Sequence, residues 1–138
     1  MRFHWRPLIP REPDPELLWG FLLAASALIA VGWLISGLPT PLCPLHALTG
    51  IPCPTCGMTR ATTALLHGHP VEALAWNPLA TLAMGAAALY VLYAAVVVIG
   101  KLPRLRWSAP TPNESRGIRI SVIFLLTANW VYLIWRGV

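Results

Sequence analysis

Three long apolar runs dominate the pattern of hydrophobic and polar positions along this 138-residue chain. They cover residues 17–37, 78–100 and 118–136, and the first two contain no charged side chain. A helix rises 1.5 Å per residue, so about 20 apolar residues cross a hydrocarbon core of about 30 Å. The pattern therefore predicts an all-α integral membrane protein with three transmembrane helices.

Local signals mark where these helices begin and end. Asn77-Pro78 is typical of a helix start, and Gly100 followed by Lys101 and Pro103 is typical of a helix end. The run 17–37 exceeds the apolar region of a cleaved signal peptide and precedes no small-x-small cleavage site. We therefore expect the first run to be a retained helix.

Composition also favours a membrane environment, because 57% of the residues are hydrophobic and only 11% are charged. A soluble domain carries about twice that share of charged residues. The net charge of +5 does not indicate nucleic acid, since the basic residues form no stripe interleaved with aromatic residues. They lie beside the apolar runs, where anionic lipid headgroups are the expected partners.

The distribution of basic residues predicts the orientation. Eight lie before the first run, between the second and third, or at the start of the third: Arg2, Arg6, Arg11, Lys101, Arg104, Arg106, Arg116 and Arg119. Only Arg60 and Arg136 fall on the other side. Because basic residues are retained on the cytoplasmic side, we expect a cytoplasmic tether (1–16) and a cytoplasmic loop (101–117). The segment 38–77 and the C-terminus are then extracytoplasmic.

The loop 38–77 carries all three cysteines and only two charged residues, Arg60 and Glu72. Disordered segments are rich in charge and poor in apolar residues, so this loop is expected to be ordered. A short helix is predicted over residues 58–67, ended by Gly68. In this nearly uncharged loop an unpaired charge is costly, so an ion pair between Arg60 and Glu72 is expected.

Three interpretations of the cysteines stay open. Cys43, His46, Cys53 and Cys56 form a C-x2-H-x6-C-x2-C pattern that would suit zinc. Alternatively, Cys53 and Cys56 precede the short helix, whose positive end and Arg60 would stabilise a reactive thiolate, with Cys43 as a third thiol. Finally, the oxidising outer face favours a purely structural disulfide, which leaves one cysteine over.

One polar residue, Asn129, interrupts the third apolar run. Polar side chains inside a membrane span usually face the other helices and form hydrogen bonds with them. A transport path would need several such groups. We therefore interpret Asn129 as a helix-packing residue that bonds another helix or the loop.

The run Cys53-Pro-Thr-Cys56-Gly-Met-Thr-Arg60-Ala61, with Cys43 upstream and Asn77-Pro78 downstream, resembles a known family. It is similar to uncharacterised bacterial membrane proteins with the signature C-P-x-C-G-x-T-R-A, catalogued as a domain of unknown function. The resemblance implies a small multi-pass protein of the bacterial inner membrane. It brings no activity with it.

Two functions from different classes are compatible with these features. The first is a non-catalytic accessory subunit or assembly factor, whose cysteine loop recognises another membrane protein or a second copy of the chain. It is favoured by the small size and by the absence of a catalytic acid or base in the predicted spans. The alternative is a thiol-redox or metal-binding membrane protein that uses Cys53, Cys56 and Arg60, or the cysteines with zinc.

Overall fold

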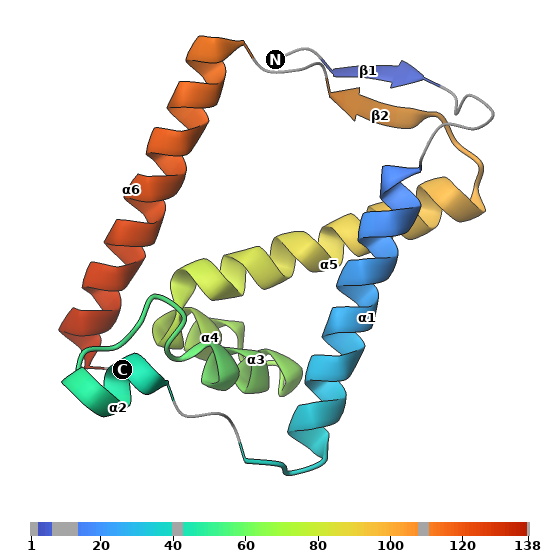
Figure 1. Ribbon diagram of the computed structural model, residues 1–138. Coiled ribbons are helices and arrows are strands. Elements are labelled where there is room, and N and C mark those ends of the chain that lie inside the picture. Colours follow the sequence, from blue (N-terminus) through green and yellow to red (C-terminus); the bar gives the residue numbers. More distant parts are fainter. Residues whose placement is uncertain (1–2, 7–13, 40–42, 108–110, 138) are drawn as a thin grey trace.

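The structure, a computed structural model, describes residues 3–6, 14–39, 43–107 and 111–137. Its elements are β1 (Phe3–Arg6), α1 (Pro15–Ile35), α2 (Pro44–Thr49), α3 (Met58–Leu66), α4 (Pro70–Trp76), α5 (Pro78–Ile99), β2 (Arg104–Trp107) and α6 (Pro112–Arg136) (Figure 1). The predicted helical architecture with an ordered loop between spans is confirmed. Two short strands and two further loop helices, α2 and α4, were not predicted.

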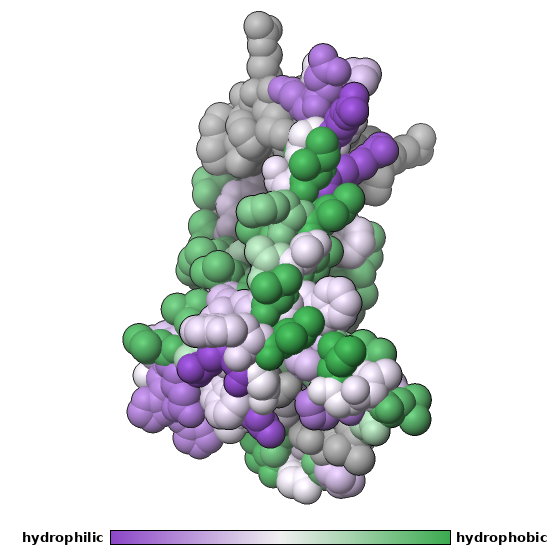
Figure 2. Space-filling model, turned by 90° about the vertical axis from the view of Figure 1, so that its left-hand side faces the viewer, coloured by the Kyte–Doolittle hydropathy of each residue, from purple (hydrophilic) through white to green (hydrophobic). Residues whose placement is uncertain are grey.

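Helices α1, α5 and α6 are long and apolar enough to cross a membrane. Large apolar side chains along them are exposed, including Leu28 of α1, Leu89 of α5 and Phe124 of α6. Figure 2 shows the face that includes α6, with hydrophobic residues along its middle and hydrophilic residues gathered at its upper end. The exposed apolar residues of a soluble protein would be a liability, whereas here they match a lipid environment.

Helices α1 and α5 approach each other closely through small residues. A Cβ atom added to Gly20 of α1 would lie 2.9 Å from the Cβ of Ala94, which is buried in α5. Close approach of this kind is how helices pack in membranes, because no hydrophobic force acts between them in lipid. Gly20 is therefore required at this position by the α1–α5 contact.

Polar side chains cap the long helices. The Asn77 side chain accepts a hydrogen bond from the backbone N–H of Ala80 at the start of α5, as the Asn-Pro signal predicted. At the start of α6, Thr111 and Glu114 form a capping box, in which each side chain binds the other residue's backbone N–H. This box extends α6 to Pro112, beyond the predicted start at residue 118.

A small apolar core lies in the loop rather than between the spans. Ala61 and Ala64 of α3 and Ala73 of α4 are buried there, and Trp76 and Met84 pack against them. The core joins α3 and α4 to the first turns of α5. It therefore fixes the loop to the membrane-spanning helices.

Strands β1 and β2 form a two-stranded antiparallel sheet, in which Phe3 pairs with Trp107 and Arg6 with Arg104. The sheet joins parts of the predicted tether (1–16) and basic loop (101–117), while residues 7–13 and 108–110 lie outside the described part of the chain. It lies at the opposite end of the spans from α2, α3 and α4 (Figure 1). Pairing between segments about a hundred positions apart leaves no local signal in a sequence.

Candidate functional site: a three-cysteine centre

The cysteines are positioned by the short segment between α2 and α3. Cys43 is the residue before α2, and Cys53 and Cys56 lie in a turn in which the Cys56 N–H donates to the Cys53 carbonyl at 2.9 Å. Gly57 then adopts a left-handed conformation, with φ at 79°, before α3 begins. Glycine adopts this conformation without steric cost, so the chain can leave the turn and enter α3 directly.

The three cysteine sulfur atoms gather at one point, all within 4.8 Å of one another. The Sγ atoms of Cys53 and Cys56 are 3.4 Å apart, and the backbone N–H of Cys53 donates to the Cys56 sulfur at 3.2 Å. The Thr55 hydroxyl lies 3.1 Å from the Cys53 sulfur. These groups can hold a soft metal ion or exchange a disulfide, since both chemistries need neighbouring sulfurs.

Cys53 and Cys56 differ in acidity. Burial raises the pKa of Cys53, but hydrogen bonds with Thr55, Cys43 and Cys56 outweigh burial and lower that pKa from 9.0 to about 7. Burial, with the hydrogen bond to Cys53, raises the pKa of Cys56 to about 11. The thiol of Cys53 therefore loses its proton at a lower pH than the thiol of Cys56.

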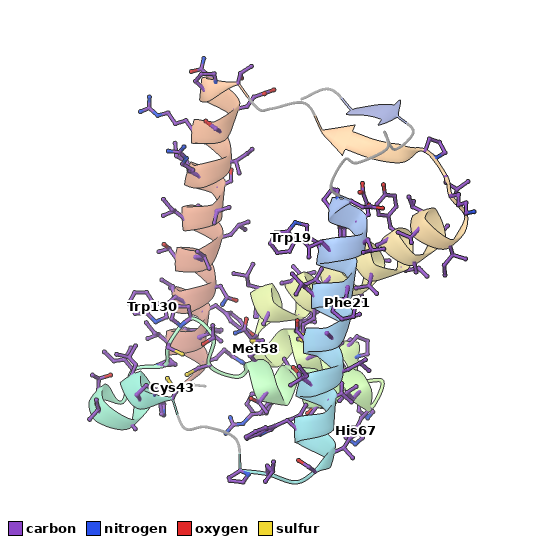
Figure 3. The ribbon with its side chains drawn as sticks, turned by 45° about the vertical axis from the view of Figure 1, so that its right-hand side comes forward. Trp19, Phe21, Cys43, Met58, His67 and Trp130 are labelled. Carbon is purple, nitrogen blue, oxygen red and sulfur yellow. The ribbon has the colours of Figure 1, made fainter. Side chains whose placement is uncertain are left out.

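The cysteines border a cleft of about 950 Å³ between the loop and the first span. Trp33 and Leu34 of α1 line one side, and His46 of α2 and Arg60 of α3 line others. All three cysteines are partly exposed, so a ligand entering the cleft can reach them. Cys43 lies beside α2, near the C-terminal end of α6 (Figure 3).

Three side chains hold the cysteine turn through its backbone carbonyls, and we call them the carbonyl clamp: Asn77, Asn129 and Trp130. The amide of Asn77 donates to the carbonyls of Cys56, at 2.9 Å, and Pro54, at 3.3 Å. The Asn129 amide also donates to Pro54, at 3.3 Å, and the Trp130 indole N–H donates to Pro52 at 2.7 Å. The turn is thus attached to both α5 and α6.

The clamp also joins α6 to α5. The Asn129 side-chain oxygen accepts a hydrogen bond from the Leu79 N–H at 3.1 Å, and Asn129 is buried. The sequence predicted that Asn129 bonds another helix or the loop, and it does both. Asn77 was predicted only as a helix cap. Its second role depends on a turn some twenty positions earlier, which the Asn-Pro signal does not reveal.

Arg60 and Glu72 meet through an aromatic ring instead of the expected ion pair. The Arg60 guanidinium carbon lies 4.7 Å from the centre of the Trp76 ring, and the Trp76 indole N–H donates to Glu72 at 3.4 Å. A guanidinium placed over the face of a tryptophan ring is attracted by its π electrons. Arg60 was also expected to lower the thiol pKa, but the main groups that lower the pKa of Cys53 are Thr55, Cys43 and Cys56.

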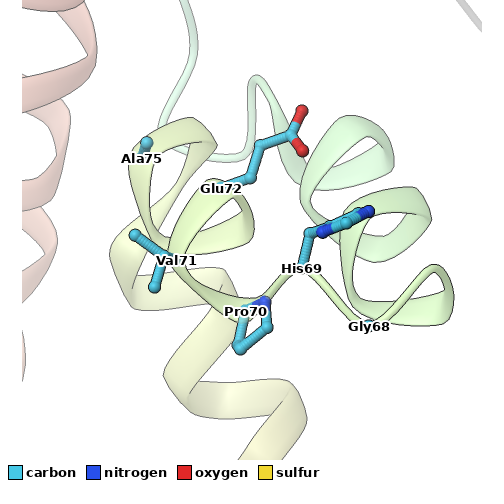
Figure 4. Close-up of a pocket in the computed structure, with 6 residues that line it drawn as sticks. All are labelled: Gly68, His69, Pro70, Val71, Glu72 and Ala75. Atoms are coloured by element: carbon cyan, nitrogen blue, oxygen red, sulfur yellow. The ribbon is translucent and has the colours of Figure 1, made fainter.

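His46 and a second pocket lie outside the cluster of the three sulfur atoms. His46 borders the cleft, whereas the cluster found among the described residues contains the cysteines alone. A second pocket of about 510 Å³ is formed by residues around the start of α4, among them His69 and Glu72 (Figure 4). None of the cysteines lines it, so we do not assign it to the site.

Among known proteins, the chain is similar to an uncharacterised family. Residues 43–96 match the model of the family described as "Protein of unknown function (DUF2752)". The matched segment contains all three cysteines, α2, α3, α4 and most of α5. No curated protein and no solved structure matches the chain.

Proposed function

We propose that this membrane protein binds one soft metal ion, such as Zn²⁺, through the thiolates of Cys43, Cys53 and Cys56. The observation that carries the proposal is the mutual approach of the three sulfurs within 4.8 Å. In a tetrahedral zinc site with Zn–S bonds of about 2.3 Å, the sulfurs lie about 3.8 Å apart. Small side-chain rotations therefore suffice to bring the three sulfurs onto one ion.

The surroundings of the sulfurs support binding of a cation. The N–H of Cys53 donates to the Cys56 sulfur, which offsets negative charge on a thiolate. Three protein ligands leave the fourth position of a tetrahedral ion free, as in zinc sites that take a water or substrate ligand. That position would face the cleft, where the His46 side chain is the candidate from this chain to fill it.

Metal binding must displace the thiol protons, so affinity should rise with pH. The pKa of Cys56, raised to about 11, makes this thiol resist deprotonation more strongly than the thiol of Cys53. The positive charge of a bound ion would lower the pKa of the Cys56 thiol. Protons released on binding are therefore a direct signature of thiolate coordination.

Titration of the anaerobically purified, metal-free protein with Co²⁺ tests the proposal. We expect a sulfur-to-cobalt charge-transfer band that saturates at one Co²⁺ per chain and disappears when Zn²⁺ is added. Changing Cys43, Cys53 or Cys56 singly to serine should reduce the band and weaken binding by more than about 100-fold, since even groups outside the ligand set contribute about 10–100-fold. A band that survives in all three variants would exclude the cysteines as ligands.

A second candidate, thiol–disulfide exchange, is favoured by the acidity difference between Cys53 and Cys56. The Cys53 thiolate would attack a partner's disulfide and release one partner thiol. Cys56 would then break the mixed disulfide, which releases the second partner thiol and leaves a Cys53–Cys56 disulfide. A Cys56→Ser variant should trap the mixed disulfide with a model disulfide, and failure to trap any adduct would reject this candidate.

The membrane orientation is part of the same proposal. We place the cysteine centre on the extracytoplasmic side of a bacterial inner membrane, because the basic segments 1–16 and 101–117 favour the cytoplasm. A cysteine introduced at Ser115 should then react with a membrane-impermeant maleimide only after cell lysis. Labelling of that position in intact cells would reverse the orientation.

The accessory role expected from the sequence stays a prediction, with the cysteine loop as its partner-recognition element. It is supported by the small size of the chain and by the exposed cysteine loop. Gentle extraction from the membrane should recover the protein with a partner or a second copy. Recovery only as a monomer would count against this role.

A further inference from the structure

The C-terminal part of α6 is attached to the cysteine loop by side-chain hydrogen bonds. Asn129 and Trp130 are adjacent in α6 and bind the carbonyls of Pro54 and Pro52, which flank Cys53. Figure 3 shows Trp130 at the same end of α6 as Cys43. The third span therefore touches the backbone on both sides of the low-pKa cysteine, although it supplies no sulfur itself.

From this contact we propose that Asn129 and Trp130 of the third span are positioning residues for the three-cysteine centre. They hold the turn in the conformation that brings the Cys53 sulfur beside Thr55 and Cys56. The effect on metal binding rests on the proposed function, whereas the effect on the reactivity of Cys53 does not. The two consequences can therefore be measured separately.

The physical argument begins with the turn itself. Residues 51–57 belong to no helix or strand, and two of them are prolines, which donate no backbone hydrogen bond. Cys53 and Cys56 donate hydrogen bonds within the turn. The bonds that tie the turn to α5 and α6 are accepted by its carbonyls, which the clamp binds. Asn129 is buried while it binds Pro54 and Leu79, and a buried amide deprived of its partners is costly. The position of Pro54 is therefore fixed relative to α5 and α6 together.

Positioning residues around metal sites usually change affinity by about 10–100-fold when they are removed. We expect Asn129→Leu, which has the same branched shape but no hydrogen-bonding group, to weaken Co²⁺ binding to this extent. In the metal-free protein the same variant should lower the rate at which Cys53 is alkylated at a fixed pH, because the contacts of the Cys53 sulfur with Thr55 and Cys56 need the turn in place. Trp130→Phe, which removes only the N–H donor, should produce a smaller change in the same direction.

Two variants on the same helix serve as controls. Thr127 donates its hydroxyl to Ile123 within α6, so Thr127→Val removes a polar group of the span without touching the loop. Trp135 is 81% exposed, so Trp135→Phe removes an indole that is not part of the clamp. Both controls should bind Co²⁺ and alkylate like the wild type. Asn129→Asp separates the two bonds of Asn129, since a carboxylate still accepts from Leu79 but does not donate to Pro54.

The experiment measures, for each variant in detergent, the Co²⁺ affinity and the rate of Cys53 alkylation at one fixed pH, read by peptide mass spectrometry. Circular dichroism and size-exclusion chromatography establish that each variant is folded. The proposal is supported if Asn129→Leu and Asn129→Asp alter both readouts and the controls alter neither. It is overturned if folded Asn129→Leu and Trp130→Phe match the wild type, or if Thr127→Val has the same effect as Asn129→Leu. If wild-type protein binds no Co²⁺, the metal proposal fails and the alkylation rate alone decides the positioning role.

Discussion

Helices α1 and α6 are attached to the rest of the molecule in contrasting ways. Helix α1 packs on α5 through small residues, with Gly20 against Ala94. Helix α6 is attached near its C-terminal end, where Asn129, Trp130 and Tyr132 form hydrogen bonds to α5, the cysteine turn and α4. Helices α1 and α5 are thus held together by close packing of small residues. Helix α6 is instead connected to the three-cysteine centre by specific hydrogen bonds.

Gly20→Leu should break the first attachment and give the largest loss of stability. The added side chain begins where a Cβ already lies 2.9 Å from Ala94, so α1 and α5 must separate. Overpacking costs about 1–3 kcal/mol, and a leucine in this contact should reach or exceed the upper value. Unfolding in a titration with sodium dodecyl sulfate measures the loss. Gly32→Leu is the matched control, because nothing lies within 4 Å of a Cβ at that position of α1. Equal losses in the two variants would contradict the packing role of Gly20.

Asn77→Ala should remove the hydrogen bonds that attach the start of α5 to the cysteine turn. It removes the cap of α5 and the donors to Pro54 and Cys56, so we expect a loss of about 2 kcal/mol. Unlike Gly20→Leu, it should also change the alkylation rate of Cys53. Asn113→Ala, at an exposed position in the first turn of α6, is the control. An unchanged alkylation rate in Asn77→Ala would mean that the clamp does not shape the site.

The pH dependence of alkylation compares Cys53 with Cys56 in the wild-type protein, without a change in the spans. In the metal-free protein, the rate of Cys53 alkylation should rise with pH, reach half of its maximum near pH 7 and level off at higher pH, because only the thiolate reacts. Alkylation of Cys56 should keep rising toward its pKa of about 11. Coincident profiles for the two cysteines would contradict the hydrogen-bonding pattern of the turn. The Gly20→Leu variant, if folded, should keep both profiles.

Tyr132→Phe should have the smallest effect. The Tyr132 hydroxyl donates to the Ala75 carbonyl at 3.0 Å, which ties α6 to the end of α4. Loss of one such bond costs about 1 kcal/mol. Because this bond does not involve the cysteine turn, Co²⁺ affinity should not change. A large change in affinity would show that α4 also positions the sulfurs.

The spans could be predicted from the sequence, because uninterrupted apolar length is a local property. The short helix predicted over 58–67 was also found, as α3 (Met58–Leu66). Helices α2 and α4 were missed, although Pro44 and Pro70 stand at their first positions and proline there is a helix-start signal. A helix of six or seven residues is too short to show a clear apolar period.

The candidate site was only partly predictable. Residue types and spacing indicated Cys43, Cys53 and Cys56 and left three arrangements open, one of which brings all three sulfurs together. Their approach in the structure depends on the turn and its carbonyl partners. The expected contact of Arg60 with Glu72 ignored Trp76, which lies four residues after Glu72 and contacts both. Trp130 lies in the third apolar run, and its bond to Pro52 joins positions 78 residues apart. Such tertiary bonds leave no trace in local sequence patterns.

Intact mass spectrometry after alkylation tests whether three thiolates share one soft ion. The protein is purified anaerobically, loaded with Zn²⁺ and treated with iodoacetamide, with or without a chelator. We predict one bound zinc and no alkyl groups without the chelator, and three alkyl groups with it, one for each of Cys43, Cys53 and Cys56. Three alkyl groups in the presence of Zn²⁺ alone, or a disulfide that limits alkylation to one group after chelation, would contradict the claim.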